Sequence, residues 1–204
     1  MYAKNTWEKY KDQLNEVFDY NEGYKHYISK NKTERACVKD SIKLAEEKGF
    51  KPLESFDTLK SGDKVYVTNR GKNIALFIIG KKPLTEGMRI LGAHIDSPRM
   101  DLKQNPLYES EGFTLADTHY YGGIKKYQWV TIPLSLYGVV CKKDGTVVDV
   151  VIGEDENDPV VGISDLLIHL SADQLDKKAA KVIEGENLDV TLGNMPLFGE
   201  EKDA

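Results

Sequence analysis

The sequence predicts an α/β protein in which helices come first and a sheet follows. Apolar residues recur at helical spacing through the first fifty residues, whereas apolar and polar residues alternate from Lys64 onward as they do in half-buried strands. The chain has 204 residues, which is long for one small domain and short for two full-sized domains. We therefore expect one domain, or one domain and part of a second.

The first fifty residues predict two helices. The first begins near Trp7 and has an apolar stripe, and Asn5 or Thr6 is its candidate N-cap. The second is expected over residues 32–48, with a capping pair formed by Asn31 and Glu34. The stripe of the first helix consists of Tyr10, Leu14, Val17 and Phe18. The second helix is expected to end at Gly49 and to bury Val38, Ile42 and Ala45.

Three strands are expected next. Residues 64–68 alternate in polarity, a turn follows at 70–73, and residues 74–79 form a continuous apolar run, so the two segments predict a hairpin with a more buried second strand. Residues 88–93 predict another short buried strand. This strand leads directly into the sequence His94-Ile95-Asp96-Ser97-Pro98.

Strands and turns dominate the rest of the chain. A long strand is expected over 127–140, with a break at Pro133 or Gly138, and a turn at 143–145 leads to a returning strand over 146–152. An acidic loop is expected at 155–159. Ser164 is the candidate cap of a short helix, and residues 188–192 predict the last strand. The candidate boundary between the two parts lies near residues 98–103.

Composition argues against several classes of function. The net charge of −5 is not that of a nucleic-acid-binding surface or of a polybasic membrane anchor. The longest apolar run has six residues, whereas about 20 are needed to cross a bilayer, and the N-terminus has no secretory signal pattern. Cys37 and Cys141 fall in no paired spacing. We therefore expect a cytoplasmic protein without nucleic-acid or membrane partners.

The best local signal for chemistry is the His94-x-Asp96 pair. Alternate residues of an extended segment point to the same side, so an imidazole and a carboxylate would lie together at the end of a buried strand. Imidazole is a common zinc ligand, and a carboxylate on its second nitrogen fixes the tautomer. The spacing alone is a weak motif, and by itself it favours a simpler interpretation, a histidine held by local hydrogen bonds beside a turn-capping aspartate.

A wider resemblance adds to that signal. Residues 90–98 resemble the signature of the M18 family of zinc aminopeptidases, the group of aspartyl aminopeptidase and aminopeptidase I. Tyr120-Tyr121-Gly122-Gly123-Ile124 followed by Trp129, the strand 134–140, and the segment 163–170 with its histidine are similar to later family segments in the same order. The similarity runs from about Thr6 to Leu192.

The resemblance implies a zinc exopeptidase-like fold with an inserted domain. Residues 1–98 would be the first part of the catalytic α/β domain, and residues 99–204 an incomplete part of a β-rich dimerisation domain inserted into it. The implied activity is removal of N-terminal amino acids from peptides by water activated by two zinc ions. The implied partners are the peptide substrate and further copies of the chain, as a homo-dodecamer in the complete enzyme.

The resemblance also implies roles for three residues. His94 matches the first zinc ligand, and Asp96 matches the carboxylate that orients it. His169 matches a histidine that the dimerisation domain presents to a neighbouring subunit's active site, where it binds substrate or stabilises the oxyanion. Without the resemblance, His169 reads as a helix-surface or core histidine beside Leu166 and Leu170.

The chain departs from the family pattern in two ways. Asp165 and residues 128–131 replace a histidine and an aromatic stretch of the aspartyl branch, which favours an aminopeptidase I-like branch. Family members are also about twice as long, and their remaining metal ligands and catalytic glutamate lie beyond residue 204. Glu200-Glu201 is a poor substitute, because it stands in a charged tail without the expected flanking residues.

Two readings follow. In the first, the chain is the N-terminal part of a metallo-aminopeptidase and is inactive by itself, because a two-metal hydrolase needs ligands on both ions and a base. In the second, it is a non-catalytic oligomerisation or interaction module derived from such an enzyme, with exposed strand edges that favour association. Whether the reading frame continues into a Glu–Glu pair and a late histidine distinguishes the two.

Overall fold

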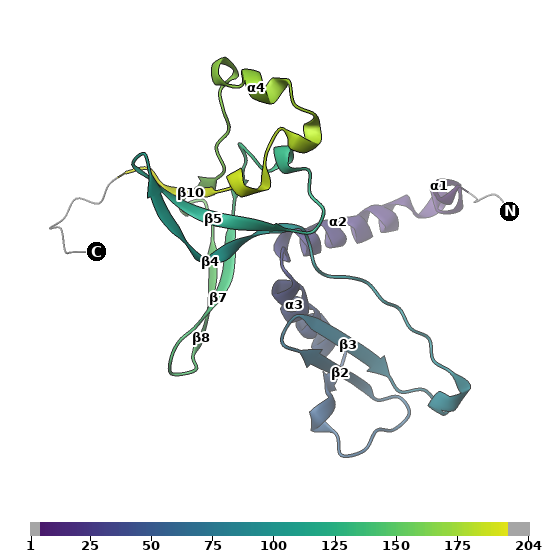
Figure 1. Ribbon diagram of the computed structural model, residues 1–204. Coiled ribbons are helices and arrows are strands. Elements are labelled where there is room, and N and C mark those ends of the chain that lie inside the picture. Colours follow the sequence, from purple (N-terminus) through teal and green to yellow (C-terminus); the bar gives the residue numbers. More distant parts are fainter. Residues whose placement is uncertain (1–4, 196–204) are drawn as a thin grey trace. The chain divides into compact units, whose positions relative to one another are not determined.

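A computed structural model describes residues 5–195 and shows a mixed α/β protein (Figure 1). The chain divides into two compact units, Met1–Ser97 and Pro98–Ala204. Glu200 and Glu201 lie outside the described residues. The α/β class expected from the sequence is confirmed, whereas the assignment of the second unit as an inserted dimerisation domain stays a prediction.

The first expected helix is interrupted near its start. Asn5 caps α1 (Thr6–Lys9) by accepting a hydrogen bond of 3.0 Å from the backbone N–H of Trp7, as expected. A 3-10 turn then precedes α2 (Leu14–Lys30). Neither helix contains a buried residue, so the expected stripe lies on the surface rather than in a core.

The second helix is α3 (Glu34–Glu47), and its cap differs from the expected one. Thr33 is the N-cap and accepts a hydrogen bond of 3.2 Å from the N–H of Ala36, whereas the Asn31 side chain donates to Asp40 instead. Gly49 follows the helix with φ of +83°, the left-handed conformation that favours glycine after a helix. The residues that α3 buries are Cys37, Val38 and Ala45.

The sheet of the first unit has three strands in the order β1-β2-β3. The expected hairpin is confirmed: β2 and β3 are antiparallel, with Lys64 opposite Ile78 and Asn69 opposite Asn73. Arg70 and Gly71 both have positive φ, which suits the right-handed twist of a tight hairpin. The strands are β1 (Lys51–Pro52), β2 (Lys64–Asn69) and β3 (Asn73–Ile78).

Two expectations for this region are wrong. β3 is not the more buried strand, because it forms the edge of the sheet and most of its side chains are exposed. Residues 88–93 do not form a buried strand; they follow a 3-10 turn at Leu84–Glu86 as an extended, exposed segment (Figure 1). An apolar run marks a segment that needs cover, but it does not supply the partner strand.

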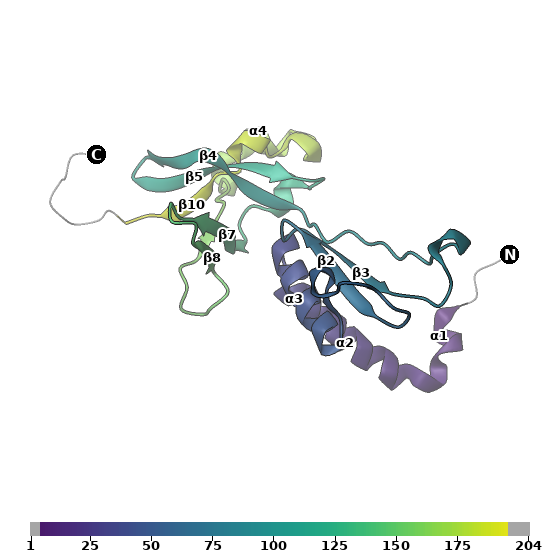
Figure 2. The same cartoon turned by 90° about the horizontal axis from the view of Figure 1, so that it is seen from below.

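The second unit is built on a five-stranded sheet in the order β4-β5-β10-β9-β6, with a separate two-stranded ribbon, β7-β8 (Figure 2). The α-helix in the described part of this unit is α4 (Ala172–Leu175). The strands are β4 (Arg99–Ser110), β5 (Phe113–Tyr121), β6 (Pro133–Leu134), β7 (Leu136–Cys141), β8 (Val147–Ile152), β9 (Val161–Gly162) and β10 (Val190–Gly193).

The expected return at 146–152 is present, but the long strand expected over 127–140 is not: Lys126–Gln128 is a 3-10 turn, and the break falls at Ser135, between β6 and β7, rather than at Pro133 or Gly138. Pro133 begins the short β6, and the ribbon places Cys141 opposite Val147 across the turn. The long β4-β5 hairpin was not anticipated as an element. Its register shifts between Leu102 and Leu107, where four residues of β4 lie opposite one residue of β5, and this irregularity interrupts the alternation by which strands are recognised.

The core of the second unit centres on Leu188, which has no exposed surface. The Thr118 hydroxyl donates a hydrogen bond to the Leu188 carbonyl, so this buried polar group is satisfied. The buried side chains of this core are Ala116, Val130, Val161, Ile163, Ile183, Leu188 and Val190. They come from β5, β9, β10 and the loops between them, so the segment 160–190 is fixed onto the β4-β5 hairpin.

Tyr108 on β4 donates a hydrogen bond of 2.6 Å to Oδ2 of Asp189, beside β10. This bond raises the pKa of Tyr108 to about 12. A raised tyrosine pKa stabilises the fold below the unfolded value of about 10, and this stabilisation is lost between pH 10 and 12. We expect Tyr108→Phe to lower the free energy of unfolding by about 1 kcal/mol at pH 8, and the difference from wild type to vanish by pH 12.

Urea unfolding at pH 8, 10 and 12 measures this difference. Tyr127→Phe is the matched control, because Tyr108 and Tyr127 are both 40% exposed and no hydrogen bond from Tyr127 to a carboxylate occurs among residues 5–195. An equal loss of stability in both variants, or a difference that persists at pH 12, would contradict the role of the Asp189 bond.

Candidate metal-binding site

His94 and Asp96 form a local pair in the first unit. Nδ1 of His94 lies 3.2 Å from Oδ1 of Asp96 and 3.1 Å from the backbone carbonyl oxygen of the same residue. The pair is open to solvent, because 85% of the His94 side chain and 41% of the Asp96 side chain are exposed. The expected proximity of imidazole and carboxylate is therefore present in the structure.

The two contacts determine which nitrogen of His94 can bind a metal. A backbone carbonyl only accepts, so Nδ1 must carry the proton to make this hydrogen bond. Nε2 then presents a lone pair, and the neighbouring carboxylate orients the ring. This is the arrangement of a metal-binding histidine with its orienting carboxylate, so His94 fits as a zinc ligand.

The described residues do not complete a metal site. No group of three or more His, Cys, Asp or Glu side chains with ligand geometry occurs between residues 5 and 195. A catalytic zinc ion takes three protein ligands, and a pair of ions needs more. The donor set therefore fits one part of a zinc site.

His169 lies in the second unit, on the 3-10 turn Ile168–Leu170. It is exposed, as are Leu166, Leu167 and Leu170 around it, so the interpretation of His169 as a core residue is wrong. The expected helix after Ser164 is also absent: the chain is irregular until this turn, and α4 begins only at Ala172. His169 thus stands in an exposed apolar loop.

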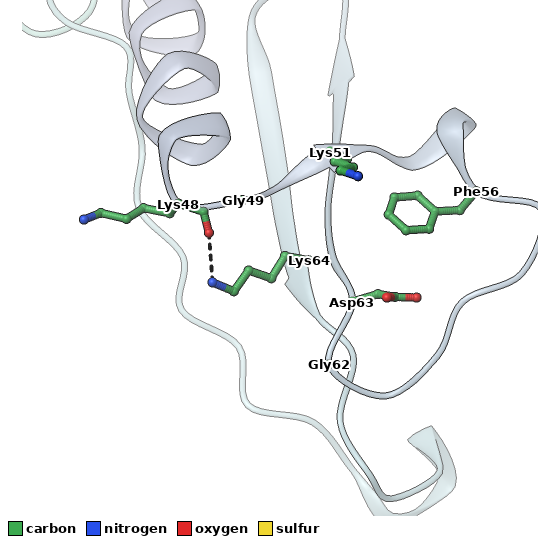
Figure 3. A pocket seen from close by; sticks show the side chains of 7 residues that line it. All are labelled: Lys48, Gly49, Lys51, Phe56, Gly62, Asp63 and Lys64. Atoms are coloured by element: carbon green, nitrogen blue, oxygen red, sulfur yellow. Dashed lines mark hydrogen bonds between the residues drawn. The ribbon is translucent and has the colours of Figure 1, made fainter.

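A hollow of about 310 Å³ lies in the first unit, at the end of α3. Nζ of Lys64 donates a hydrogen bond of 2.8 Å to the Lys48 carbonyl and thereby satisfies an acceptor at the end of the helix. The Lys48 side chain points away from the hollow (Figure 3). The Asp63 carboxylate accepts from the backbone N–H of Lys60. These groups serve the local fold, and the hollow contains no imidazole. Its lining is Lys48, Gly49, Lys51, Phe56, Gly62, Asp63 and Lys64.

The second unit has a hollow of about 300 Å³ beside the core. Asp165 is one of the residues that line it, and its Oδ1 accepts hydrogen bonds from the Leu166 N–H at 2.8 Å and from the Gln174 side-chain amide at 3.0 Å. The sequence singled out Asp165 only as a departure from a family pattern. The structure shows that this carboxylate joins the loop before His169 to α4.

Thr131 has a feature that sequence reasoning missed. Its φ is +62°, a conformation that is strained for a β-branched residue. The Thr131 N–H donates a hydrogen bond of 2.8 Å to the Ile163 carbonyl, and this bond joins the chain before β6 to the chain after β9. No local signal in the sequence indicates this conformation, because it is imposed by residues some thirty positions away.

Comparisons with known proteins place the chain in a family. The family model described as aminopeptidase I zinc metalloprotease (M18) matches residues 27–203. A protein of Clostridium acetobutylicum named probable M18 family aminopeptidase 1 is 59% identical over 98% of this chain and 44% of its own length. A Thermotoga maritima protein of the same name is 46% identical over 100% of the chain and 44% of its own length.

Solved structures of M18 aminopeptidases also match the chain. A crystal structure of an M18 aminopeptidase from Thermotoga maritima matches with a TM-score of 0.89 and 45% identity, over 99% of this chain and 44% of that one. Aminopeptidase I from Clostridium acetobutylicum matches with a TM-score of 0.83 and 56% identity, over 99% and 45%.

These likenesses define the class of protein: the fold is that of metal-dependent peptidases, which are hydrolases. The chain belongs to the M18 family of zinc metalloproteases, of which it matches the N-terminal portion. It spans less than half the length of these relatives. Among the described residues, no helix is both long and apolar enough to cross a membrane.

Proposed function

We propose that this chain supplies the N-terminal part of an aminopeptidase that removes N-terminal residues from peptides. The geometry of His94 carries the proposal: Nδ1 is held by Asp96, and the imidazole is 85% exposed, within a chain of the M18 family. Family membership supports the reaction class, and the local geometry supports the role of this residue.

In the proposed mechanism, His94 is a metal ligand and Asp96 is its positioning residue. When bound, a pair of zinc ions would polarise the scissile carbonyl and lower the pKa of the attacking water. Asp96 would keep the Nδ1 proton in place, so that the lone pair of Nε2 stays directed outward. The remaining ligands and the general base would come from the part of the relatives that this chain does not match.

We also propose that residues 99–204 form a dimerisation domain of a homo-oligomer. The exposed apolar side chains around His169 support it, since such a loop is suited to insertion at a subunit contact. The yeast protein mApe1 is described as a dodecamer, but at 24% identity that likeness extends to the fold alone. A reducing cytoplasmic location fits the free Cys37 and Cys141.

A second candidate function is a non-catalytic interaction module. The β7-β8 ribbon favours it, because this two-stranded sheet exposes Val140, Val147 and Val151 and has free edges among the described strands. Such a module would associate with itself without binding zinc.

Zinc analysis and peptidase assays separate the two functions. The test protein is a chimera that joins residues 1–204 to the remaining carboxy-terminal portion of the Clostridium acetobutylicum relative. We expect two zinc ions per chimera and chelator-sensitive cleavage of leucyl- or aspartyl-anilide, and neither from residues 1–204 alone. A folded chimera without zinc or cleavage would favour the interaction module.

His169→Ala in the chimera tests whether His169 acts in the active site of a neighbouring subunit. We expect turnover to fall about 100-fold or more, as when an oxyanion donor is removed, with zinc content unchanged. His119→Ala is the control, because His119 is also exposed in the second unit and stacks on Tyr120 at 5.5 Å. Unchanged turnover, or equal effects of both substitutions, would refute the role of His169.

A further inference from the structure

The loop that carries His169 is not held in place by burial of its own apolar side chains. In this histidine loop, which we define as residues 166–170, all four apolar side chains are between 52% and 71% exposed. The imidazole of His169 makes no hydrogen bond within residues 5–195. The position of the ring therefore depends on the backbone of the loop and on the contacts that fix this backbone.

Polar contacts hold both ends of the histidine loop. Before it, Oδ1 of Asp165 accepts hydrogen bonds from the Leu166 N–H at 2.8 Å and from the Gln174 side-chain amide at 3.0 Å. After it, Ser171 is only 6% exposed, and its hydroxyl donates a hydrogen bond of 3.1 Å to the Ile168 carbonyl. The Ser171 carbonyl in turn accepts from the backbone N–H of Gln174 at 3.0 Å. Gln174 is thus bonded to the residues on either side of the loop.

The bond between Asp165 and Gln174 closes residues 165–174 into a ring. The hydrogen bonds of residues 166–170 themselves all end between Asp165 and Ser171 in the described part of the chain, so none of them ties the loop to the sheet. Asp165 and Gln174 also line the hollow of about 300 Å³ beside the core, where the loop lacks close packing beneath it. A hydrogen bond to a carboxylate is stronger than one between neutral groups. This bond is therefore the contact that determines the shape of the loop.

We infer that Asp165 and Gln174 are positioning residues for His169. Their hydrogen bond fixes the backbone of the histidine loop and thereby the place from which the imidazole reaches a neighbouring site. A group that stabilises charge in a transition state must be held close to its productive position, because a displacement of about 1 Å can cost about 100-fold in rate. The inference rests on the proposed function for the role of His169, but not for the closure of the loop.

Backbone amide order parameters from NMR relaxation of residues 1–204 test the closure. We expect values of about 0.85 for residues 166–170 in the wild type, and values below about 0.6 in Asp165→Ala and in Gln174→Leu. The double variant should be no more mobile than either single one, because each substitution removes the same bond.

Asp173→Ala is the matched control for the order parameters. Asp173 is an exposed carboxylate on α4 and makes no hydrogen bond to the histidine loop within residues 5–195. We expect this variant to keep the wild-type values. A histidine loop that is already mobile in the wild type, or one that becomes equally mobile in Asp173→Ala, would overturn the inference.

Cleavage of leucyl-anilide by the chimera tests the positioning of His169. We expect Asp165→Ala to lower kcat/KM about tenfold with zinc content unchanged, and Asp165→Asn to recover most of this loss, since asparagine keeps an acceptor oxygen. In a His169→Ala background, Asp165→Ala should lower kcat/KM by less than about twofold more, because no imidazole is left to position. A full tenfold loss in that background, or no recovery with asparagine, would overturn the inference.

Two outcomes separate this inference from the proposed function. If His169→Ala leaves turnover unchanged while the order parameters still fall in Asp165→Ala, the proposed role of His169 fails and the closure of the loop stands. If His169→Ala lowers turnover but Asp165→Ala and Gln174→Leu do not, the role of His169 stands and the positioning inference is overturned.

Discussion

His94→Ala in the chimera is expected to remove most of the bound zinc and nearly all peptidase activity. A zinc ligand supplies several kcal/mol of transition-state stabilisation through the ion that it holds, so we expect a loss of about 1000-fold or more. The substitution should leave the fold intact, because the imidazole is 85% exposed and its hydrogen-bonding contacts within residues 5–195 are to Asp96, two positions away. Elemental analysis and anilide cleavage measure the two losses, and circular dichroism checks the fold.

His26→Ala is the control for this substitution. His26 lies exposed on α2, so its removal changes the histidine count without touching the candidate site. We expect wild-type zinc content and activity from this variant. Full zinc content in His94→Ala would refute the assignment of His94 as a ligand.

Asp96→Asn tests the positioning role separately. An asparagine oxygen can still accept the Nδ1 proton, and so can the backbone carbonyl of residue 96 at 3.1 Å, so only the negative charge is lost. We expect zinc affinity to fall about 10–100-fold, as is usual when the carboxylate behind a metal-binding histidine is replaced. Competition with a zinc-binding dye measures the affinity, and a wild-type value would show that Asp96 does not tune His94.

Local sequence signals predicted local structure well. The cap at Asn5, the glycine after α3 and the β2-β3 hairpin each depend on residues a few positions apart, and each is present. Burial was predicted poorly where it depends on distant segments. The stripe of α2 and the run in β3 are apolar, but most of their side chains are exposed in the first unit, and Val17 and Ile74 are only half-buried.

In the candidate site, too, the sequence predicted what depends on neighbouring residues and missed what depends on distant segments. The contact between His94 and Asp96 is local, and the spacing of two residues was enough to predict it. The exposure of His169 and the strained φ of Thr131 depend on how segments tens of residues apart meet, and sequence patterns carry no such information. The roles of these residues therefore rest on the family resemblance and on the proposed experiments, not on the pattern.

The second large effect is expected at Leu188, far in sequence from the candidate ligand. Leu188→Ala leaves a cavity at a position with no exposed surface, among Ala116, Ile163 and Val190, and such replacements lower the free energy of unfolding by about 2–5 kcal/mol. Trp129 packs against this core and Trp7 is exposed in the first unit. Because these are the chain's two tryptophans, a Trp7→Phe background makes fluorescence report on the second unit alone.

Urea unfolding followed by Trp129 fluorescence should show a large shift for Leu188→Ala and less than about 0.5 kcal/mol for the control Leu175→Ala, whose side chain is 66% exposed. Hydrogen exchange in α3 reports on the first unit at the same time. If the two units have separate cores, the amides of α3 keep their protection when the second unit is destabilised. Loss of protection in both units would show that they unfold as one body, and a small shift for Leu188→Ala would show that this core is not close-packed.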